Sequence, residues 1–169
     1  MKIRKLTTMA LLAAVALIIF IVEAQIPPIV PIPGIKLGLS NIITVYAVWV
    51  LGAKEAVAIL LVRIFLGAVF AGNFSTIFYS LGGGGAAILT TIGLKFVLRE
   101  NQLWVAGCIG AIAHSVGQMI VAVWISETPS LMIYLPVMIL CSIVTGLFTG
   151  LLSQIMVKRG KNLWKTIFK

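Results

Sequence analysis

The sequence predicts an all-α integral membrane protein, a compact single-domain bundle of six transmembrane helices. The chain of 169 residues is 61% hydrophobic and only 10% charged, whereas soluble domains are nearer half apolar and a quarter charged. Its apolar stretches suit membrane spans of about 20 residues. The alternation typical of a transmembrane β-barrel is absent, so the spans are predicted to be helices. They are expected at about residues 7–22, 39–51, 55–71, 76–98, 103–125 and 131–157.

Basic residues predict how these spans are oriented. Every Lys and Arg except Lys36 and Arg63 precedes the first span, follows the last, or lies in or close to a connection on that same side. Because basic loops stay in the cytoplasm, both termini are predicted to be cytoplasmic. The net charge of +9 then reflects orientation and contact with anionic lipid. Nucleic-acid binding is not expected, since the bases are divided among short loops.

The first span, residues 7–22, carries small residues one turn apart, Ala10 and Ala14, near its cytoplasmic end. Such a face permits close approach of another helix, either within the bundle or on a partner protein. A cleaved signal peptide is the alternative for this span, because it has a basic start and an apolar core. No clear A-x-A cleavage site follows, so a retained span is favoured.

The segment after the first span contains Glu23, four prolines and Lys36. The prolines fix φ and remove amide donors, so the segment cannot cross lipid as a helix. Its isoleucines make it too apolar to extend into water. We expect a proline-rich cap that folds over the outer end of the bundle and delivers Lys36 to a pocket mouth; a simple interfacial loop is the alternative. The prolines are Pro27, Pro28, Pro31 and Pro33.

The third span, residues 55–71, places Arg63 near the middle of the membrane. An unpaired charge there costs at least about 2.5 kcal/mol. Arg63 therefore either binds backbone carbonyls or a carboxylate as a structural brace, or lines a polar cavity and meets an anion. Asn41 begins the second span at its outer end, and Asn73 follows the outer end of the third.

Later spans add small and polar residues. Four glycines begin at Gly82 without the Lys-Ser or Lys-Thr of a P-loop, so they indicate close helix packing or, alternatively, a local unwinding around a ligand. His114 and Gln118 are four residues apart and share a helix face. Gly146 and Gly150 form a GxxxG pair in the last span. Cys108 and Cys141 are expected to be small core residues, and no metal-site spacing is present.

These polar residues all fall at the middle or in the outer half of the predicted bundle. One pocket open to the outside would explain this distribution. Bases outnumber acids in it, so an anionic or acceptor-rich small ligand is expected. The predicted ligand-binding residues are Glu23, Lys36, Asn41, Arg63, Asn73, His114 and Gln118.

The stretches "EAQIPP", "PGIKLGLSNIITVYAVWVLG", "LLVRIFLG" and "AHSVGQ" together resemble the Gx transporter family, also labelled heptaprenyl diphosphate synthase component I. That family is similar to the substrate-binding S components of energy-coupling-factor transporters. The resemblance implies six helices with cytoplasmic termini and an outer-half pocket under a capping loop. It also implies docking of an AxxxA face, matched by Ala10 and Ala14, on a membrane coupling subunit attached to ATPases.

The composition argues against catalysis by this chain. Prenyl diphosphate synthesis needs carboxylates that hold Mg²⁺, but the chain has only four acidic residues, all of them scattered glutamates. No nucleophile–base pair and no intrinsic cofactor are expected. The sequence thus favours a substrate-binding transporter subunit. The alternative is a membrane adaptor of a flavin- or quinone-linked extracellular electron-transfer complex, which family members also resemble.

Overall fold

A computed structural model describes residues 2–26, 36 and 38–167. All regular structure in these residues is helical, which confirms the predicted all-α class for the described part of the chain. One helix corresponds to each predicted span, and two short 3-10 helices precede the last two. The elements are α1 (Lys2–Ala24), α2 (Asn41–Val50), α3 (Ala53–Ala71), α4 (Ser75–Lys95), η1 (Glu100–Gln102), α5 (Leu103–Ser126), η2 (Pro129–Tyr134) and α6 (Leu135–Ile167).

The ends of the first and last helices differ from the predicted spans. α1 begins at Lys2 rather than at residue 7, and α6 continues to Ile167 rather than ending at 157. Lys and Arg are good helix formers, so a helix can continue past its apolar stretch. The start of the predicted last span is instead the 3-10 helix η2, which begins at Pro129. The predicted cap over residues 27–35 lies outside the described residues.

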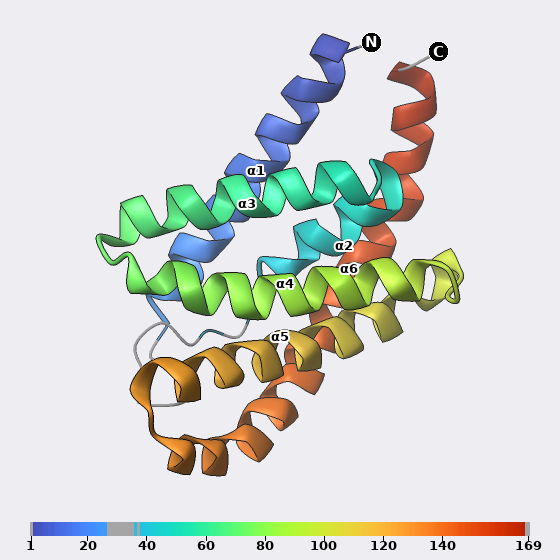
Figure 1. The fold of residues 1–169 in the computed structure, drawn as a ribbon. Coiled ribbons are helices and arrows are strands. Elements are labelled where there is room, and N and C mark those ends of the chain that lie inside the picture. The colour runs from blue at the N-terminus through green and yellow to red at the C-terminus, as the bar shows by residue number, and fades with distance from the viewer. Residues whose placement is uncertain (1, 27–35, 37, 168–169) are drawn as a thin grey trace.

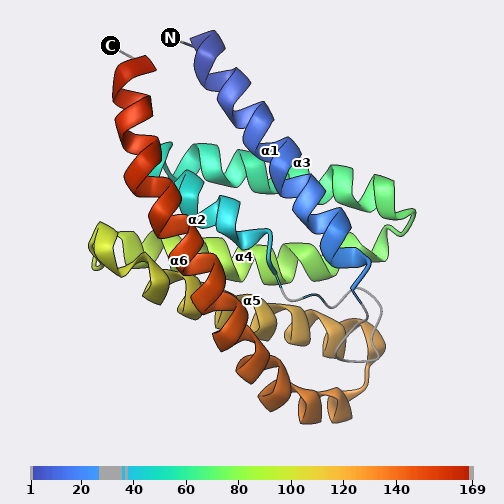
Figure 2. The ribbon, with the colours of Figure 1, turned by 180° about the vertical axis from the view of Figure 1, so that it is seen from behind.

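The short helix α2 forms the centre of the bundle. It contacts every other α-helix, and all its residues except Tyr46 and Val50 are buried. α3, α4 and α5 lie side by side, while α1 and α6 run obliquely to them (Figures 1 and 2). The start of α1 and the end of α6 project at the same end of the molecule (Figure 1). Because α2 is enclosed, its N-terminal Asn41 is placed inside the bundle.

The four glycines lie within the continuous helix α4, so the structure favours close packing over the unwinding alternative. A Cβ added at Gly82 would lie 2.8 Å from the Gly117 carbonyl oxygen of α5. One at Gly84 would lie 3.0 Å from Leu60 of α3. Successive glycines therefore admit helices on two sides of α4.

Helices α5 and α6 also approach each other closely through their backbones, and this contact yields a stability prediction. A Cβ at Gly107 would lie 2.5 Å from the Gly146 oxygen and 2.7 Å from the Gly150 nitrogen. We expect Gly107→Ala to destabilise the protein by about 1–3 kcal/mol, because backbone must move to admit the methyl group. Gly93→Ala is the matched control, since a Cβ there has no neighbour within 4 Å. Thermal unfolding in detergent measures both; equal midpoints would contradict this packing.

Four helical stretches are long and apolar enough to cross a membrane: Ile3–Ala24, Ser75–Lys95, Glu100–Ser126 and Pro129–Gly160. The remaining two α-helices differ in length or charge. α2 has 10 residues, or about 15 Å at 1.5 Å per residue, and α3 contains Lys54, Glu55 and Arg63. The fold is that of a helical membrane protein, and the six-span topology stays a prediction.

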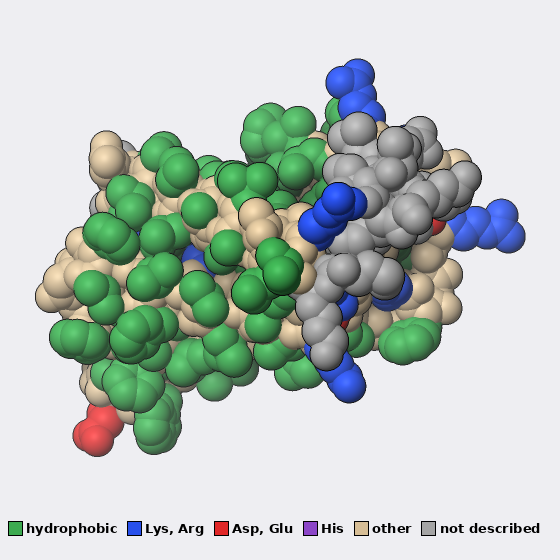
Figure 3. Space-filling model, turned by 90° about the horizontal axis from the view of Figure 1, so that it is seen from above, with side chains coloured by type: hydrophobic (Ala, Val, Ile, Leu, Met, Phe, Trp, Pro, Cys, Tyr) green, Lys and Arg blue, Asp and Glu red, His purple; other side chains and the backbone are tan. Residues whose placement is uncertain are grey.

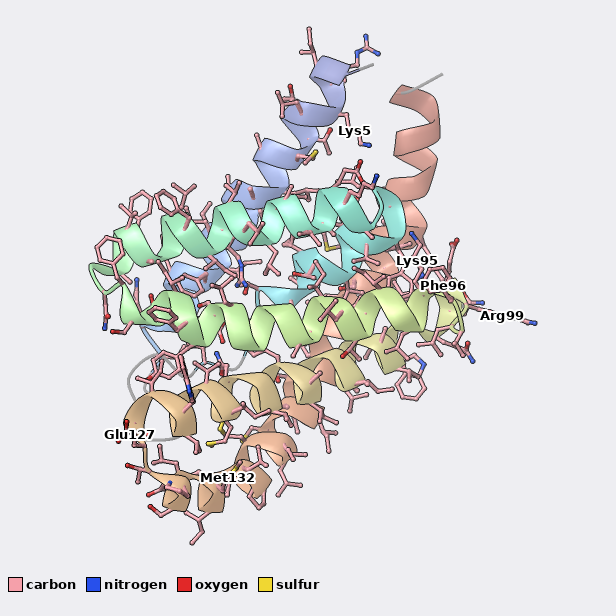
Figure 4. All side chains as sticks on the ribbon, viewed as in Figure 1. Lys5, Lys95, Phe96, Arg99, Glu127 and Met132 are labelled. Atoms are coloured by element: carbon pink, nitrogen blue, oxygen red, sulfur yellow. The ribbon has the colours of Figure 1, made fainter. Side chains whose placement is uncertain are left out.

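The two ends of the bundle differ in charge. On the face seen in Figure 3, most Lys and Arg side chains gather around one end, while apolar side chains cover most of the rest. Figure 4 shows Lys95 and Arg99 at one end of α4, with Glu127 and Met132 at the opposite end of the molecule. This polarity fits a basic cytoplasmic end.

A topology experiment tests this orientation. A reporter fused after Lys169 is expected to be cytoplasmic, and one inserted between Glu127 and Ser130 is expected to be external. The reason is the one-sided distribution of basic residues. Activity of paired reporters, such as alkaline phosphatase and a fluorescent protein, measures both positions. Reporters that place these two sites on the same side of the membrane would contradict the orientation.

Candidate functional site

Among the buried polar side chains of the bundle, five from four helices carry charged, imidazole or amide groups and are each at most 5% exposed. Burying a polar group costs free energy unless it finds a partner, so this concentration needs an explanation. We call the five residues, together with the half-buried Lys36, the polar cluster. Its buried members are Glu23 of α1, Asn41 of α2, Arg63 of α3, and His114 and Gln118 of α5.

Arg63 is held by one part of its guanidinium group. Its Nη1 donates to the hydroxyl of Ser40, which lies in the turn before α2. Its Cζ lies 5.6 Å from the centroid of the Phe20 ring of α1. Its Nε and Nη2 have no hydrogen-bond partner among the described residues. Arg63 is thus positioned by α1 and by the turn before α2, while two of its nitrogens have no acceptor among the described residues.

His114 lies between two glycines of different segments. A Cβ at Gly83 of α4 would lie 3.0 Å from His114 Nδ1, and one at Gly38 would lie 3.2 Å from Nε2. By strict hydrogen-bond geometry neither ring nitrogen has a partner within the described part of the chain, although the ring lies close enough to the Gly83 backbone to interact with it. Both polar atoms of the Asn41 amide likewise lack a hydrogen-bond partner among the described residues, and a Cβ at Gly38 would lie 2.9 Å from its Nδ2. His114 and Asn41 therefore meet beside Gly38.

Glu23 binds the chain that leads into α2. Its Oε1 accepts from the Gly38 amide at 2.5 Å, and its Oε2 accepts from the Leu39 amide at 3.1 Å. Gly38 has a φ of +79°, a conformation that glycine adopts readily. The carboxylate therefore fastens the end of α1 to the turn before α2. The sequence predicted Glu23 as a ligand-binding residue; both its oxygens already have protein partners.

Lys36 and Gln118 join the cluster from the α1–α2 connection and from α5. The Lys36 amide donates to Gln118 Oε1 at 3.3 Å. The Lys36 ammonium lies 3.4 Å from the centroid of the Phe20 ring, a cation–π contact. Burial lowers the pKa of Lys36, and the nearby positive Arg63 lowers it further while Glu23 opposes the shift.

The structure does not bring Asn73 into the cluster. Asn73 is exposed between α3 and α4, where its Oδ1 accepts from the Ser75 amide at 2.9 Å. That bond belongs to the start of α4, as is common for Asn at a helix N-terminus. The other six predicted site residues belong to the connected set of contacts described above.

The predicted docking residues Ala10 and Ala14 are both exposed on α1, while Ala13 and Ala16 of the same helix are buried. α1 packs against α3 and, less extensively, α2, so Ala10 and Ala14 lie on its open side. Leu6, one turn before Ala10, lines a cleft between α1 and α3. The cleft is also lined by Lys5, Met9, Lys54 and Glu55, and Lys5 forms an ion pair with Glu55.

Sequence reasoning missed Ser40, Gly38, Gly83 and Phe20. Ser40 adjoins Asn41 in "GLSN", so its position offered a weak signal. Phe20 lies in an apolar helix that gives no sign of a cation above its ring. These contacts depend on how separate helices pack, which local spacing does not reveal.

The chemistry of the cluster is that of hydrogen-bonding and charged side chains. Among the described residues, no group of three or more His, Cys, Asp or Glu side chains is placed to hold a metal ion. Ser115, next to His114, bonds instead to Ser142 at 2.5 Å. What the cluster offers is hydrogen-bond donors and acceptors in a buried setting, with two positive side chains and one negative.

The family described as heptaprenyl diphosphate synthase component I matches residues 12–156. The matched region contains the whole polar cluster and Ala14, while Ala10 lies just before it. No curated protein and no solved structure matches the chain. The match is to the family that the sequence motifs resemble.

Proposed function

The chain belongs to the family described as heptaprenyl diphosphate synthase component I, and from this and the polar cluster we propose that it is the substrate-binding subunit of an energy-coupling-factor-type transporter. It binds a small anionic organic molecule in the polar cluster. The cluster opens toward the outer side of the bacterial cell membrane, and both termini are cytoplasmic. Transport draws its energy from ATPases in trans.

One observation carries this proposal. Arg63 is buried, 3% exposed, and its Nε and Nη2 lack partners among the described residues. A buried guanidinium that serves only as a brace should have its donors occupied, because unpaired buried donors cost about 1–3 kcal/mol each, and more when charged. A bound anion would satisfy these donors. The unpartnered atoms of His114 and Asn41 support the same interpretation.

The enzymatic name of the family does not require catalysis by this chain. The chain contains four acidic residues, all glutamates. Glu23 bonds to backbone amides and Glu55 pairs with Lys5. Diphosphate chemistry uses clustered carboxylates to hold Mg²⁺. We therefore assign the chain a non-catalytic role. A numbered component also implies other subunits.

The partner in this proposal is a membrane coupling subunit that carries the ATPases. The exposed Ala10 and Ala14 supply a small-residue face suited to close helix contact in lipid. The adjoining cleft lined by Lys5 and Glu55 places charged groups at the cytoplasmic end of that face. α1 thus joins the docking face at one end to Glu23 of the polar cluster, and to the neighbouring Phe20, at the other.

The experiment that tests this function is recovery of the bound molecule. Protein extracted gently from its native membrane is analysed by native mass spectrometry and by its absorbance spectrum. A small organic anion bound at one copy per chain is the expected result. A flavin or quinone chromophore would instead favour the electron-transfer adaptor. Protein that carries no small molecule in any preparation would contradict the proposal.

Lys36 gives a kinetic prediction for the same site. Lys36→Ala is expected to slow capture of the anion severalfold with little change in its dissociation rate, since a peripheral charge mainly steers encounter. Because the pKa of Lys36 is lowered from 10.5, the wild-type association rate should fall as the pH rises, starting below that value. Stopped-flow tryptophan fluorescence measures both rates. An unchanged association rate, or a change confined to dissociation, would contradict steering by Lys36.

A further inference from the structure

The two available nitrogens of Arg63 lie on one edge of its guanidinium group. Nη1 is occupied by Ser40, while Nε and Nη2 have no partner in the described residues. Nε–H and one Nη2–H point in the same direction, because the guanidinium group is planar. This edge matches two oxygens of one carboxylate or phosphate, which accept two parallel hydrogen bonds. Arg63 thus offers a two-point contact.

The charges of the polar cluster favour a carboxylate over a phosphate. Arg63 and Lys36 are positive and Glu23 is negative, so the cluster has an excess of one positive charge when His114 is neutral. A carboxylate brings one negative charge and balances it. A phosphate monoester brings about 1.5 to 2 negative charges at neutral pH, and a diphosphate brings more. Excess buried charge is costly, so a monoanion fits best.

His114 and Asn41 indicate what the rest of the molecule carries. Both ring nitrogens of His114 and both amide atoms of Asn41 lack partners among the described residues. A neutral imidazole has one donor and one acceptor, and a side-chain amide has both kinds of atom. A neutral group that can both donate and accept, such as an amide or a ring N–H beside a carbonyl, would satisfy them. The backbones of Gly38 and Gly83 pack against this imidazole, since a Cβ at either glycine would lie within 3.0 Å of a ring carbon.

We infer that the polar cluster takes a monocarboxylate that also bears a neutral donor–acceptor group, with the carboxylate on the Nε–Nη2 edge of Arg63. His114 and Asn41 then determine specificity for the neutral group. This inference rests on the proposed function and adds the chemical class of the substrate. The charge balance excludes prenyl diphosphates and phosphate monoesters from the site.

The test identifies the compound released from purified wild-type protein by denaturation. High-resolution mass spectrometry measures its phosphorus content, and conversion to methyl esters counts its carboxyl groups. We expect one carboxyl group, no phosphorus and an amide-like group. Release of a phosphorylated compound, or of one without a carboxyl group, would overturn the inference while leaving the binding function intact. Failure to release any compound would count against the proposed function itself.

Two Arg63 variants test the two-point contact with that same compound. Arg63→Lys keeps the positive charge but loses the pair of parallel N–H donors. We expect the affinity of this variant for the compound to fall about tenfold or more, nearly as far as that of Arg63→Gln. His114→Ala should weaken binding of the compound itself. It should have a smaller effect on binding of an analogue that lacks the neutral group. If Arg63→Lys binds as tightly as wild type, only charge matters and the bidentate assignment is wrong. Thermal unfolding confirms that each variant is folded.

Discussion

Arg63→Gln is expected to weaken binding of the anion about ten- to a hundredfold while the protein stays folded. Gln keeps hydrogen-bonding capacity at similar length but carries no charge. Loss of a charge-assisted contact in a poorly hydrated site is worth about 1.5–3 kcal/mol, which corresponds to this range. The measurement is the dissociation constant of the molecule recovered from wild type, together with thermal stability in detergent with and without it.

Two further variants serve as comparisons for Arg63→Gln. Lys54→Gln removes a positive charge from an exposed position on the same helix, and its affinity should equal that of wild type. His114→Ala should weaken binding less than Arg63→Gln, because a neutral imidazole makes weaker hydrogen bonds than a guanidinium. If Arg63→Gln lowers stability equally with and without the molecule and leaves its affinity unchanged, Arg63 is a structural brace.

Ala10→Leu/Ala14→Leu is expected to abolish co-purification with a coupling subunit while leaving binding of the small molecule unchanged. Two leucines on an exposed small-residue face would hold a partner helix away, and helix contacts in membranes depend on close backbone approach. Both alanines are exposed, so the bundle itself should accommodate the change. Quantitative co-purification from the native membrane measures the effect.

The matched control for docking lies on the same helix. Val15→Leu/Val22→Leu adds volume at exposed positions of α1 that face about 100° away from Ala10 and Ala14, at 3.6 residues per turn. These substitutions should leave co-purification intact. If both double variants lose co-purification to the same extent, the substitutions cause a general defect of α1. If Ala10→Leu/Ala14→Leu still co-purifies with the coupling subunit, this face of α1 is not the docking surface.

Much of the fold follows from the apolar stretches. Their lengths predicted six helices, and one helix is present for each. The predicted helix ends were less accurate than the helix number, because residues such as Lys2 and Lys158 extend helices beyond their apolar stretches. The central place of α2 could not be predicted either, since its 10 residues gain burial from contacts with all the other helices rather than from any local signal.

The candidate site was predictable where a polar residue interrupts an apolar helix. Arg63, His114 and Gln118 are such residues, and the structure buries all three. Asn73 failed to join them because its own helix start uses its side chain. Glu23 was predicted to follow the first span, but it lies in the last turn of α1, and its bonds to Gly38 and Leu39 depend on a left-handed turn that sequence spacing does not specify.

Native mass spectrometry of wild type and Arg63→Gln, extracted side by side from the same membrane, tests the central claim most directly. The account predicts a small organic anion bound to wild type at one copy per chain and largely lost from the folded variant. An equal amount of the same molecule on both proteins, or none on wild type, would contradict a ligand-binding role for Arg63.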